Sequence, residues 1–247
     1  MKYAVYVEGQ SELLFVADVL QKYSQYDPQR CGFLCINLSS DDFFRLSFPQ
    51  QGSEGSADYY QIVNVNNDNR VISKLKNDIP GLIDNGYNVI IGLKDVFGTT
   101  YEQLTNSEPI IDRAMIVSMH SAQTSALKAP IGCDCRLHFA IMEYEAWMLA
   151  LIENFVKNCG KEVADLCQEL KIDLATDFEN TVYHPYSLVK SIYKACGSDY
   201  HKHSGESYSF LSTLSLADYE ALRCSGRCAS FAKFIDSLLG GNCPRLP

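Results

Sequence analysis

The chain has 247 residues, of which 47% are hydrophobic and 21% are charged. This composition is typical of a folded globular protein and excludes a disordered or collagen-like one. The formal net charge of −9 argues against a surface that binds nucleic acid over its whole extent, but it leaves room for a local basic groove.

The first hundred residues alternate short apolar runs with amphipathic stretches, which is typical of a parallel sheet covered by helices. Strands are predicted at Tyr3–Val7, Phe33–Leu38, Tyr59–Val65 and Tyr87–Leu93, with helices over Ser11–Tyr23 and from about Val71 to Leu82. Ser11 is expected to cap the first helix, and Asp68 or Asn69 the second. The polar stretch 50–56 predicts a loop, Pro80 is expected to kink the second helix, and Asn85–Gly86 to end it.

Beyond Gly98 the pattern becomes mainly helical. The sequence predicts a short helix over Ile110–His120, a turn at 130–132, and a strand over Leu137–Met142 that runs directly into a helix over Tyr144–Val156. Further helices are predicted over Lys161–Leu170, Pro185–Cys196, Leu216–Leu222 and Ala229–Leu239. We therefore expect an α/β domain over residues 1–157 and a helical C-terminal subdomain over residues 158–247 packed on it.

Targeting and membrane-spanning segments are not expected. The apolar run after Lys2 ends at Glu8, before it reaches the ~7–15 residues of a signal-peptide core. The longest unbroken apolar run, Ala146–Ile152, is far shorter than the ~20 residues that span a bilayer. We expect a cytoplasmic protein without membrane contact whose ten cysteines are thiols, and their spacing does not favour a structural zinc site.

Three predicted strands end in acidic residues. Val7 is followed by Glu8, Leu93 by Lys94 and Asp95, and Met142 by Glu143, Tyr144 and Glu145. The carboxyl ends of parallel strands share one edge of a sheet, so these carboxylates are expected to converge, and such oxygen ligands suit Mg²⁺ or Mn²⁺. Alternatively, Glu8, Glu12 and Glu145 lie in the first turns of helices, where the macrodipole stabilises a carboxylate by about 0.3–1 kcal/mol.

Several motifs resemble Toprim domains, the catalytic fold of topoisomerases, primases and OLD-type nucleases. The segment Val7–Glu12 resembles the opening Toprim motif, and Asp95–Gly98 is similar to the acidic segment after a later strand. Met142–Ala150 resembles the Glu-x-Glu-Ala helix of an uncharacterised bacterial Toprim-like family that is often found beside defence genes. The resemblance spans most of the chain, since Tyr200–Lys202, Leu214–Leu222 and Cys228–Phe231 are also similar to that family.

This resemblance implies a Toprim-like α/β fold and a metal-dependent nuclease that hydrolyses phosphodiester bonds, with a role in phage defence. It implies Mg²⁺ or Mn²⁺ as cofactor, nucleic acid as substrate with DNA favoured over RNA, and a partner protein from a defence operon. Glu8, Asp95 and Glu145 are the expected catalytic residues. Glu8, Asp95, Glu143 and Glu145 are the candidate metal ligands, Glu12 is a supporting ligand, and Lys202 is a candidate phosphate contact.

One departure from the family pattern concerns the chemistry. Toprim domains usually carry an Asp-x-Asp pair, whereas Phe97 stands two residues after Asp95. Glu143 or Glu145 is expected to replace the missing carboxylate, and both reach one ion only if Glu143 precedes the regular helix, because they are about 200° apart on a helix. If neither does, the protein is a catalytically inactive binding or partner subunit; another phosphate-transfer reaction at the same edge is a third alternative.

Overall fold

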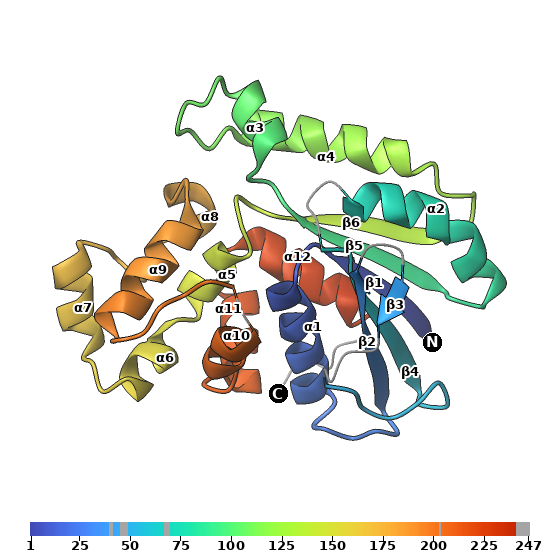
Figure 1. The fold of residues 1–247 in the computed structure, drawn as a ribbon, viewed down its shortest axis with the longest axis horizontal. Helices are drawn as coiled ribbons and strands as arrows, with labels where there is room; N and C mark the ends of the chain where they lie inside the picture. Colours follow the sequence, from blue (N-terminus) through green and yellow to red (C-terminus); the bar gives the residue numbers. More distant parts are fainter. Residues whose placement is uncertain (40–41, 45–48, 67–69, 203, 241–247) are drawn as a thin grey trace. The chain divides into compact units, whose positions relative to one another are not determined.

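The structure is a computed structural model that describes residues 1–39, 42–44, 49–66, 70–202 and 204–240 (Figure 1). It divides into two compact units. Unit 1 comprises Met1–Lys94, Arg113–Phe139 and Lys233–Pro247, and unit 2 comprises Asp95–Asp112 and Ala140–Ala232. Each unit is assembled from separate stretches of the chain, so the division does not follow the segments 1–157 and 158–247 expected from the sequence.

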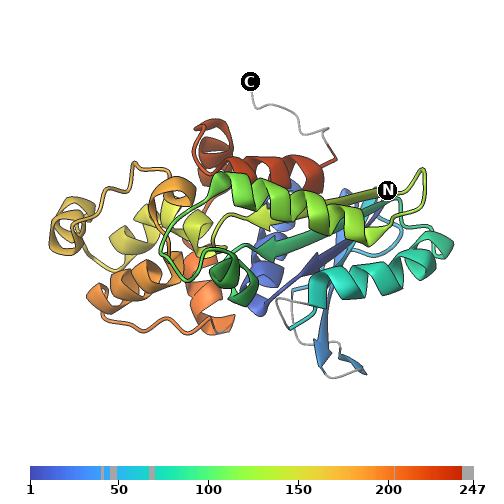
Figure 2. The same cartoon turned by 90° about the horizontal axis from the view of Figure 1, so that it is seen from above.

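Within the described residues, a six-stranded sheet forms the centre of unit 1, in the order β3-β2-β4-β1-β5-β6 (Figures 1 and 2). The strands are β1 (Lys2–Val7), β2 (Cys31–Ser39), β3 (Asp42–Phe44), β4 (Asp58–Asn64), β5 (Val89–Asp95) and β6 (Asp134–Ala140). The five longer strands run parallel, whereas the short β3 pairs antiparallel with β2. The predicted α/β class with a mostly parallel sheet flanked by helices is therefore confirmed.

Helices cover both faces of this sheet. On one face, α2 (Arg70–Asp84) approaches β5 closely at Gly92, where an added Cβ would lie 2.7 Å from Leu75 Cδ1. Helix α4 (Arg113–Leu127) packs against α2 (Figure 2). On the opposite face, the Tyr60 hydroxyl donates a hydrogen bond to the Leu238 carbonyl of α12 (Ala229–Leu238). Successive side chains of a strand point to opposite faces of the sheet. Because helices cover both faces, the strands are apolar on both sides.

The first helices match the prediction closely, with one correction at a cap. Helix α1 spans Gln10–Tyr23 and its N-cap is Gly9, so the expectation that Ser11 caps it is wrong; Ser11 is buried in the first turn instead. The expected caps of α2, Asp68 and Asn69, lie outside the described residues. Pro80 lies inside α2, and the helix ends at Asp84, before the left-handed Gly86 (φ +78°), as the Asn85–Gly86 signal predicted.

The middle of the chain departs further from the prediction. Instead of one helix over 110–120, there are α3 (Thr99–Leu104) and the longer α4. The strand predicted to reach Met142 ends at Ala140, and Met142 itself has a left-handed φ of +65°. The helix predicted over 144–156 is two helices, α5 (Glu145–Ala150) and α6 (Glu153–Asn158), because the chain leaves helical geometry at Leu151 (φ −112°, ψ 3°).

The C-terminal half of the described chain is helical, as predicted. Its remaining elements are α7 (Val163–Leu170), α8 (Phe178–Thr181), α9 (Pro185–Ala195), α10 (Ser204–Leu211) and α11 (Leu216–Cys224). Helix α9 carries proline at its first position, where the missing N–H costs nothing. In the described part of the chain, no helix has both the length and the apolar character that a membrane span needs.

Candidate functional site: an acid network in unit 2

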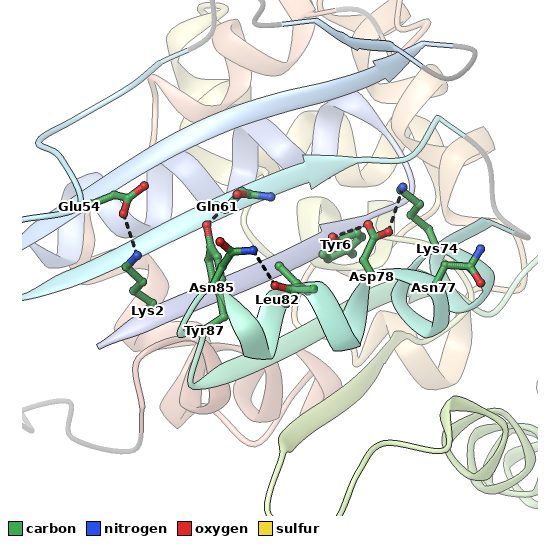
Figure 3. Close-up of a pocket in the computed structure, with 11 residues that line it drawn as sticks. Lys2, Tyr6, Glu54, Gln61, Lys74, Asn77, Asp78, Leu82, Asn85 and Tyr87 are labelled. Atoms are coloured by element: carbon green, nitrogen blue, oxygen red, sulfur yellow. Dashed lines mark hydrogen bonds and ion pairs between the residues drawn. The ribbon is translucent and has the colours of Figure 1, made fainter.

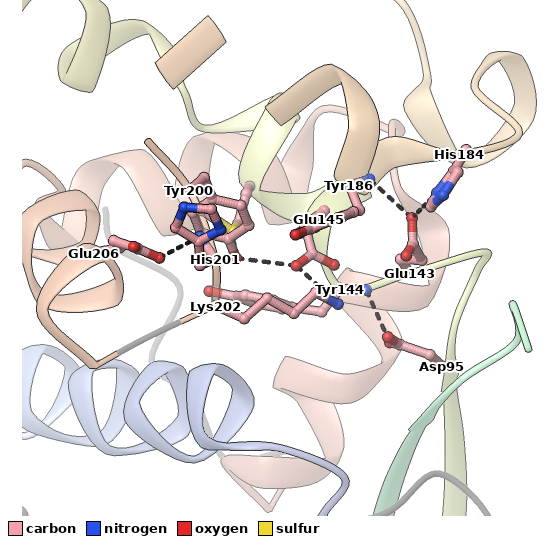
Figure 4. A network of polar contacts seen from close by, with 11 residues as sticks. Asp95, Glu143, Tyr144, Glu145, His184, Tyr186, Tyr200, His201, Lys202 and Glu206 are labelled. Atoms are coloured by element: carbon pink, nitrogen blue, oxygen red, sulfur yellow. Dashed lines mark hydrogen bonds and ion pairs between the residues drawn. The ribbon is translucent and has the colours of Figure 1, made fainter. Parts of the chain in front are cut away.

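Asp95, the last residue of β5, is hydrogen-bonded to the segment that carries Glu143 and Glu145. Its Oδ1 accepts a hydrogen bond from the backbone N–H of Tyr144 at 2.8 Å, across 49 residues of sequence (Figure 4). Just beyond it, the Phe97 N–H donates to the Met142 carbonyl at 2.6 Å. These bonds bring two of the three acidic strand ends together within unit 2.

The junction after β6 frees Glu143 from the helix. Because Met142 is left-handed and α5 begins at Glu145, Glu143 lies outside regular helical geometry. The condition that Glu143 precede the helix is therefore met, and its direction is not fixed at 200° from that of Glu145. The side chains of Glu143 and Glu145 nevertheless contact different partners.

Glu143 is held by the start of α9. Its Oε2 accepts the Tyr186 N–H at 2.8 Å and lies 3.0 Å from His184 Nδ1, and the Glu143 side chain is 8% exposed. An N–H in the first helical turn has no intrahelical acceptor, and the helix dipole favours an anion there. The Tyr186 N–H and the His184 imidazole thus meet at the same carboxylate oxygen of Glu143.

Glu145 is fully buried beside a lysine. Its Oε1 accepts the Tyr200 hydroxyl at 3.0 Å and lies 3.0 Å from Lys202 Nζ (Figure 4). The Lys202 ammonium also lies 5.2 Å from the centroid of the Tyr186 ring. Burying a carboxylate is costly unless a cation and hydrogen-bond donors accompany it. Lys202, which was predicted to contact phosphate, thus serves here as the counter-ion of Glu145.

Phe97 stands where the Asp-x-Asp pair would have its second carboxylate, and it packs against His184. Its ring stacks on the imidazole of His184, with centroids 4.7 Å apart and planes inclined by 23°. The ring of Tyr183 meets Phe97 edge-on at 5.4 Å. The position where a second Asp was expected therefore contributes to orienting the His184–Glu143 pair. Sequence reasoning missed His184, since nothing local marks a histidine that meets Glu143 across 41 residues.

Glu8 and Glu12 belong to unit 1. Glu8 Oε1 lies 3.8 Å from Lys94 Nζ, and both side chains are nearly buried. Glu12 is buried in the first turn of α1 and folds back over Gly9, where an added Cβ would lie 2.7 Å from Glu12 Oε2. Because Asp95, Glu143 and Glu145 belong to the other unit, the participation of Glu8 and Glu12 in a common site stays a prediction.

A second buried acid, Glu179 on α8, was not predicted. Trp147 Nε1 donates to its Oε1 at 3.0 Å, the Ser230 hydroxyl donates to the same oxygen, and the Ser230 N–H donates to Oε2 at 3.3 Å. Burial raises the pKa of Glu179 in spite of these donors. This acid joins α5, α8 and the start of α12, so its role is to hold the unit together.

The donor chemistry of unit 2 fits a hard cation, whereas the present arrangement of the donors is not that of a preformed metal centre. Asp95, Glu143 and Glu145 offer only carboxylate oxygens, the ligands that Mg²⁺ and Mn²⁺ prefer. In the described ranges, no group of three or more acidic, histidine or cysteine side chains is placed to hold one ion. Binding through Glu145 would require this carboxylate to exchange its contact with Lys202 for the ion.

Comparison of the chain with protein-family models, with curated proteins and with solved structures found no match. Of the six predicted site residues, the structure brings Asp95, Glu143, Glu145 and Lys202 together in one unit.

Proposed function

We propose that this protein is a Toprim-like nuclease that uses Mg²⁺ or Mn²⁺ to hydrolyse phosphodiester bonds in nucleic acid, with DNA favoured over RNA. Its proposed setting is phage defence in the cytoplasm, together with a partner protein from the same operon. The acid network of unit 2, formed by Asp95, Glu143 and Glu145, is the proposed centre.

The hydrogen bond from the Tyr144 N–H to Asp95 carries this proposal. It joins Asp95, at the end of a parallel strand, to the backbone of Tyr144, whose two neighbours in the sequence are Glu143 and Glu145. Gathering buried acids in this way costs stability unless donors compensate, so such clusters are more typical of functional sites than of structural ones. The proposed ligands all come from short, well-anchored segments.

Each side chain has a distinct proposed role. Asp95 and one of Glu143 or Glu145 would hold the ion, which supplies charge stabilisation at the phosphate and activation of water. His184 and the Tyr186 N–H keep Glu143 oriented. Lys202 neutralises Glu145 before the substrate arrives and, once displaced, is placed to contact a phosphate oxygen.

Cleavage assays test the proposal. Purified protein with Mg²⁺ or Mn²⁺ should cleave plasmid or linear DNA, and chelation should stop the reaction. Asp95→Asn and Glu145→Gln should abolish cleavage, whereas Asp165→Asn, at an exposed acid on α7 of the same unit, should not. Glu8→Ala is also expected to abolish it, and normal activity of that variant would dismiss Glu8 alone. Undiminished cleavage by Asp95→Asn would dismiss the proposed centre.

A catalytically inactive binding or partner subunit is the second candidate. The contact of Lys202 with Glu145 and the aromatic Phe97 at the second acidic position favour it, because both leave fewer carboxylates available to an ion. Calorimetric titration with Mn²⁺ distinguishes the two candidates. Metal binding that Asp95→Asn removes supports the nuclease, whereas the absence of binding and cleavage supports the inactive subunit.

A further inference from the structure

A pocket of about 290 Å³ lies along helix α9 in unit 2. It is lined by Ser187, Lys190, Ser191, Lys194, Asp199 and Tyr200. The four residues from α9 are spaced by three and four positions, so they share one face of the helix. Two lysine ammonium groups and the Ser187 hydroxyl therefore line one wall of the pocket as hydrogen-bond donors, whereas the Ser191 hydroxyl donates to the Ser187 carbonyl at 3.0 Å.

The charge of this pocket is opposite to that of the chain. Two lysines and one aspartate line it, although the chain carries a formal net charge of −9. Among the described residues, neither Lys190 nor Lys194 forms an ion pair; Lys190 Nζ instead lies 5.4 Å from the Tyr186 ring centroid. An excess of positive charge with neighbouring hydroxyls is suited to an anion with several oxygen atoms, such as a phosphate.

Two tyrosines connect the pocket to the acid network. Tyr200 lines the pocket, and its hydroxyl contacts Glu145 at 3.0 Å. The Tyr186 ring lies beneath both Lys190 and Lys202. Figure 4 shows Tyr186, Tyr200 and Lys202 gathered around Glu145. The basic wall of α9 thus adjoins the carboxylates within one unit.

The larger pocket of unit 1 offers a contrast. It has a volume of about 510 Å³, and its charged side chains are matched: Lys2 pairs with Glu54 at 2.7 Å, and Lys74 with Asp78 at 3.0 Å (Figure 3). Two lysines and two acids leave no net charge for an anion. The difference between the two pockets singles out the one along α9.

We propose that the α9 pocket binds the phosphate backbone of a nucleic acid strand and thereby places the neighbouring phosphodiester at the acid network. This inference rests on the proposed nuclease function and adds a subsite to it. Lys190 and Lys194 contact backbone phosphates, and the Ser187 hydroxyl is placed to donate a hydrogen bond to the same oxygens. Because these contacts involve only the backbone, the pocket confers affinity without base specificity.

Salt-dependent binding in the presence of a chelator tests the subsite without any cleavage. The probe is a short, fluorescently labelled single-stranded DNA, and anisotropy gives Kd over a range of salt concentrations. Each phosphate contact contributes about 0.7 to the slope of log Kd against log salt for single strands, so Lys190→Gln/Lys194→Gln should lower the slope by about 1.4. Lys157→Gln/Lys171→Gln changes the net charge equally at exposed positions elsewhere in unit 2 and should leave the slope unchanged.

The outcomes separate this inference from the nuclease proposal. A slope that depends on Lys190 and Lys194 supports the subsite even if the wild type never cleaves, in which case only the nuclease proposal fails. Equal slopes for the two double variants, or no DNA binding by the wild type, overturn the subsite even if cleavage is observed.

Ser191→Asp, which adds a negative charge to the same wall, should weaken binding as well. Displacement of the DNA by inorganic phosphate at the same molar concentration as the DNA would identify a site for the free anion. This result would overturn the assignment of the pocket to a nucleic acid backbone.

Discussion

His138 in unit 1 and Glu179 in unit 2 are both shielded titratable groups, but their surroundings differ. His138 packs edge-on against Phe234 with ring centroids 5.7 Å apart, and its buried Nε2 has no hydrogen-bond partner among the described residues. Glu179 accepts hydrogen bonds from Trp147 and from both the hydroxyl and the N–H of Ser230. Burial lowers the pKa of His138 to about 4 and raises the pKa of Glu179.

These shifts make stability depend on pH in opposite directions. Between pH 6.5 and about 4, unfolded His138 binds a proton that the folded form does not, so stability falls as the pH falls. Folded Glu179 keeps its proton above the pKa of the unfolded form, so stability falls as the pH rises through that range. The buried imidazole of His138 therefore has no partner that would stabilise its charged form, whereas the buried carboxylate of Glu179 is surrounded by hydrogen-bond donors.

The largest effect is expected at Glu145, the fully buried acid of unit 2. Lys202→Met should lower the free energy of unfolding by about 3 kcal/mol, the lower end for a broken buried pair because Lys202 is 37% exposed. Urea denaturation measures the loss. Glu145→Gln combined with Lys202→Met should recover most of it, since no buried charge then remains. If Lys202→Met is as stable as the wild type, the pair is not a structural contact.

His138→Leu should remove the contribution of His138 to the loss of stability at low pH. The wild type is expected to lose up to about 3 kcal/mol between pH 6.5 and pH 4 through this histidine, because the pKa falls by more than two units. Thermal melting of both proteins across this range measures the difference. His201→Gln, at an exposed histidine, is the matched control and should follow the wild type. If His138→Leu loses as much stability as the wild type between pH 6.5 and pH 4, His138 is hydrated in the folded protein and its pKa is not lowered by burial.

Glu179→Gln should remove the opposite response of unit 2, with a smaller effect because hydrogen-bond donors already oppose the shift. The amide keeps an acceptor for Trp147 but carries no charge, so the stability of the variant relative to the wild type should increase as the pH rises. Denaturation midpoints over a pH series provide the measurement, with the exposed Glu153→Gln as control. A difference that shrinks with rising pH contradicts the raised pKa.

The smallest effect is expected in the unit 1 pocket. The Lys2 and Glu54 side chains are 31% and 63% exposed, and such pairs contribute at most about 1 kcal/mol. Lys2→Ala should therefore change the unfolding free energy by less than this amount, and high salt should reduce the difference further. A larger, salt-independent loss in a chemical denaturation series would show that this pair behaves like the buried pair of unit 2.

The sequence predicted the parts of the fold that depend on local patterns. Continuous apolar runs marked β1 and β5, and the Asn85–Gly86 stop placed the end of α2. The stretch 146–152 is apolar at every position, so its periodicity gave no sign of the break at Leu151. Left-handed Met142, which ends β6 early, carries no local signal either.

Of the candidate site, the sequence predicted only the acidic residues that follow the ends of predicted strands. Asp95, Glu143 and Glu145 follow apolar runs, and the rule that parallel strands end at one edge was enough to group them. His184 and Glu179 meet their partners across 41 and 32 residues, through helices whose packing no local pattern specifies. The counter-ion role of Lys202 depends likewise on tertiary structure, since only the fold brings it to Glu145.

A crystal structure of the protein soaked with Mn²⁺ is the most direct test of the acid network as a metal-dependent centre. The anomalous signal should place one ion against Asp95 and at least one of Glu143 and Glu145, and Lys202 should have moved away from Glu145 if Glu145 is a ligand. An ion bound elsewhere, or no ion at the acid network at saturating Mn²⁺, would contradict the account.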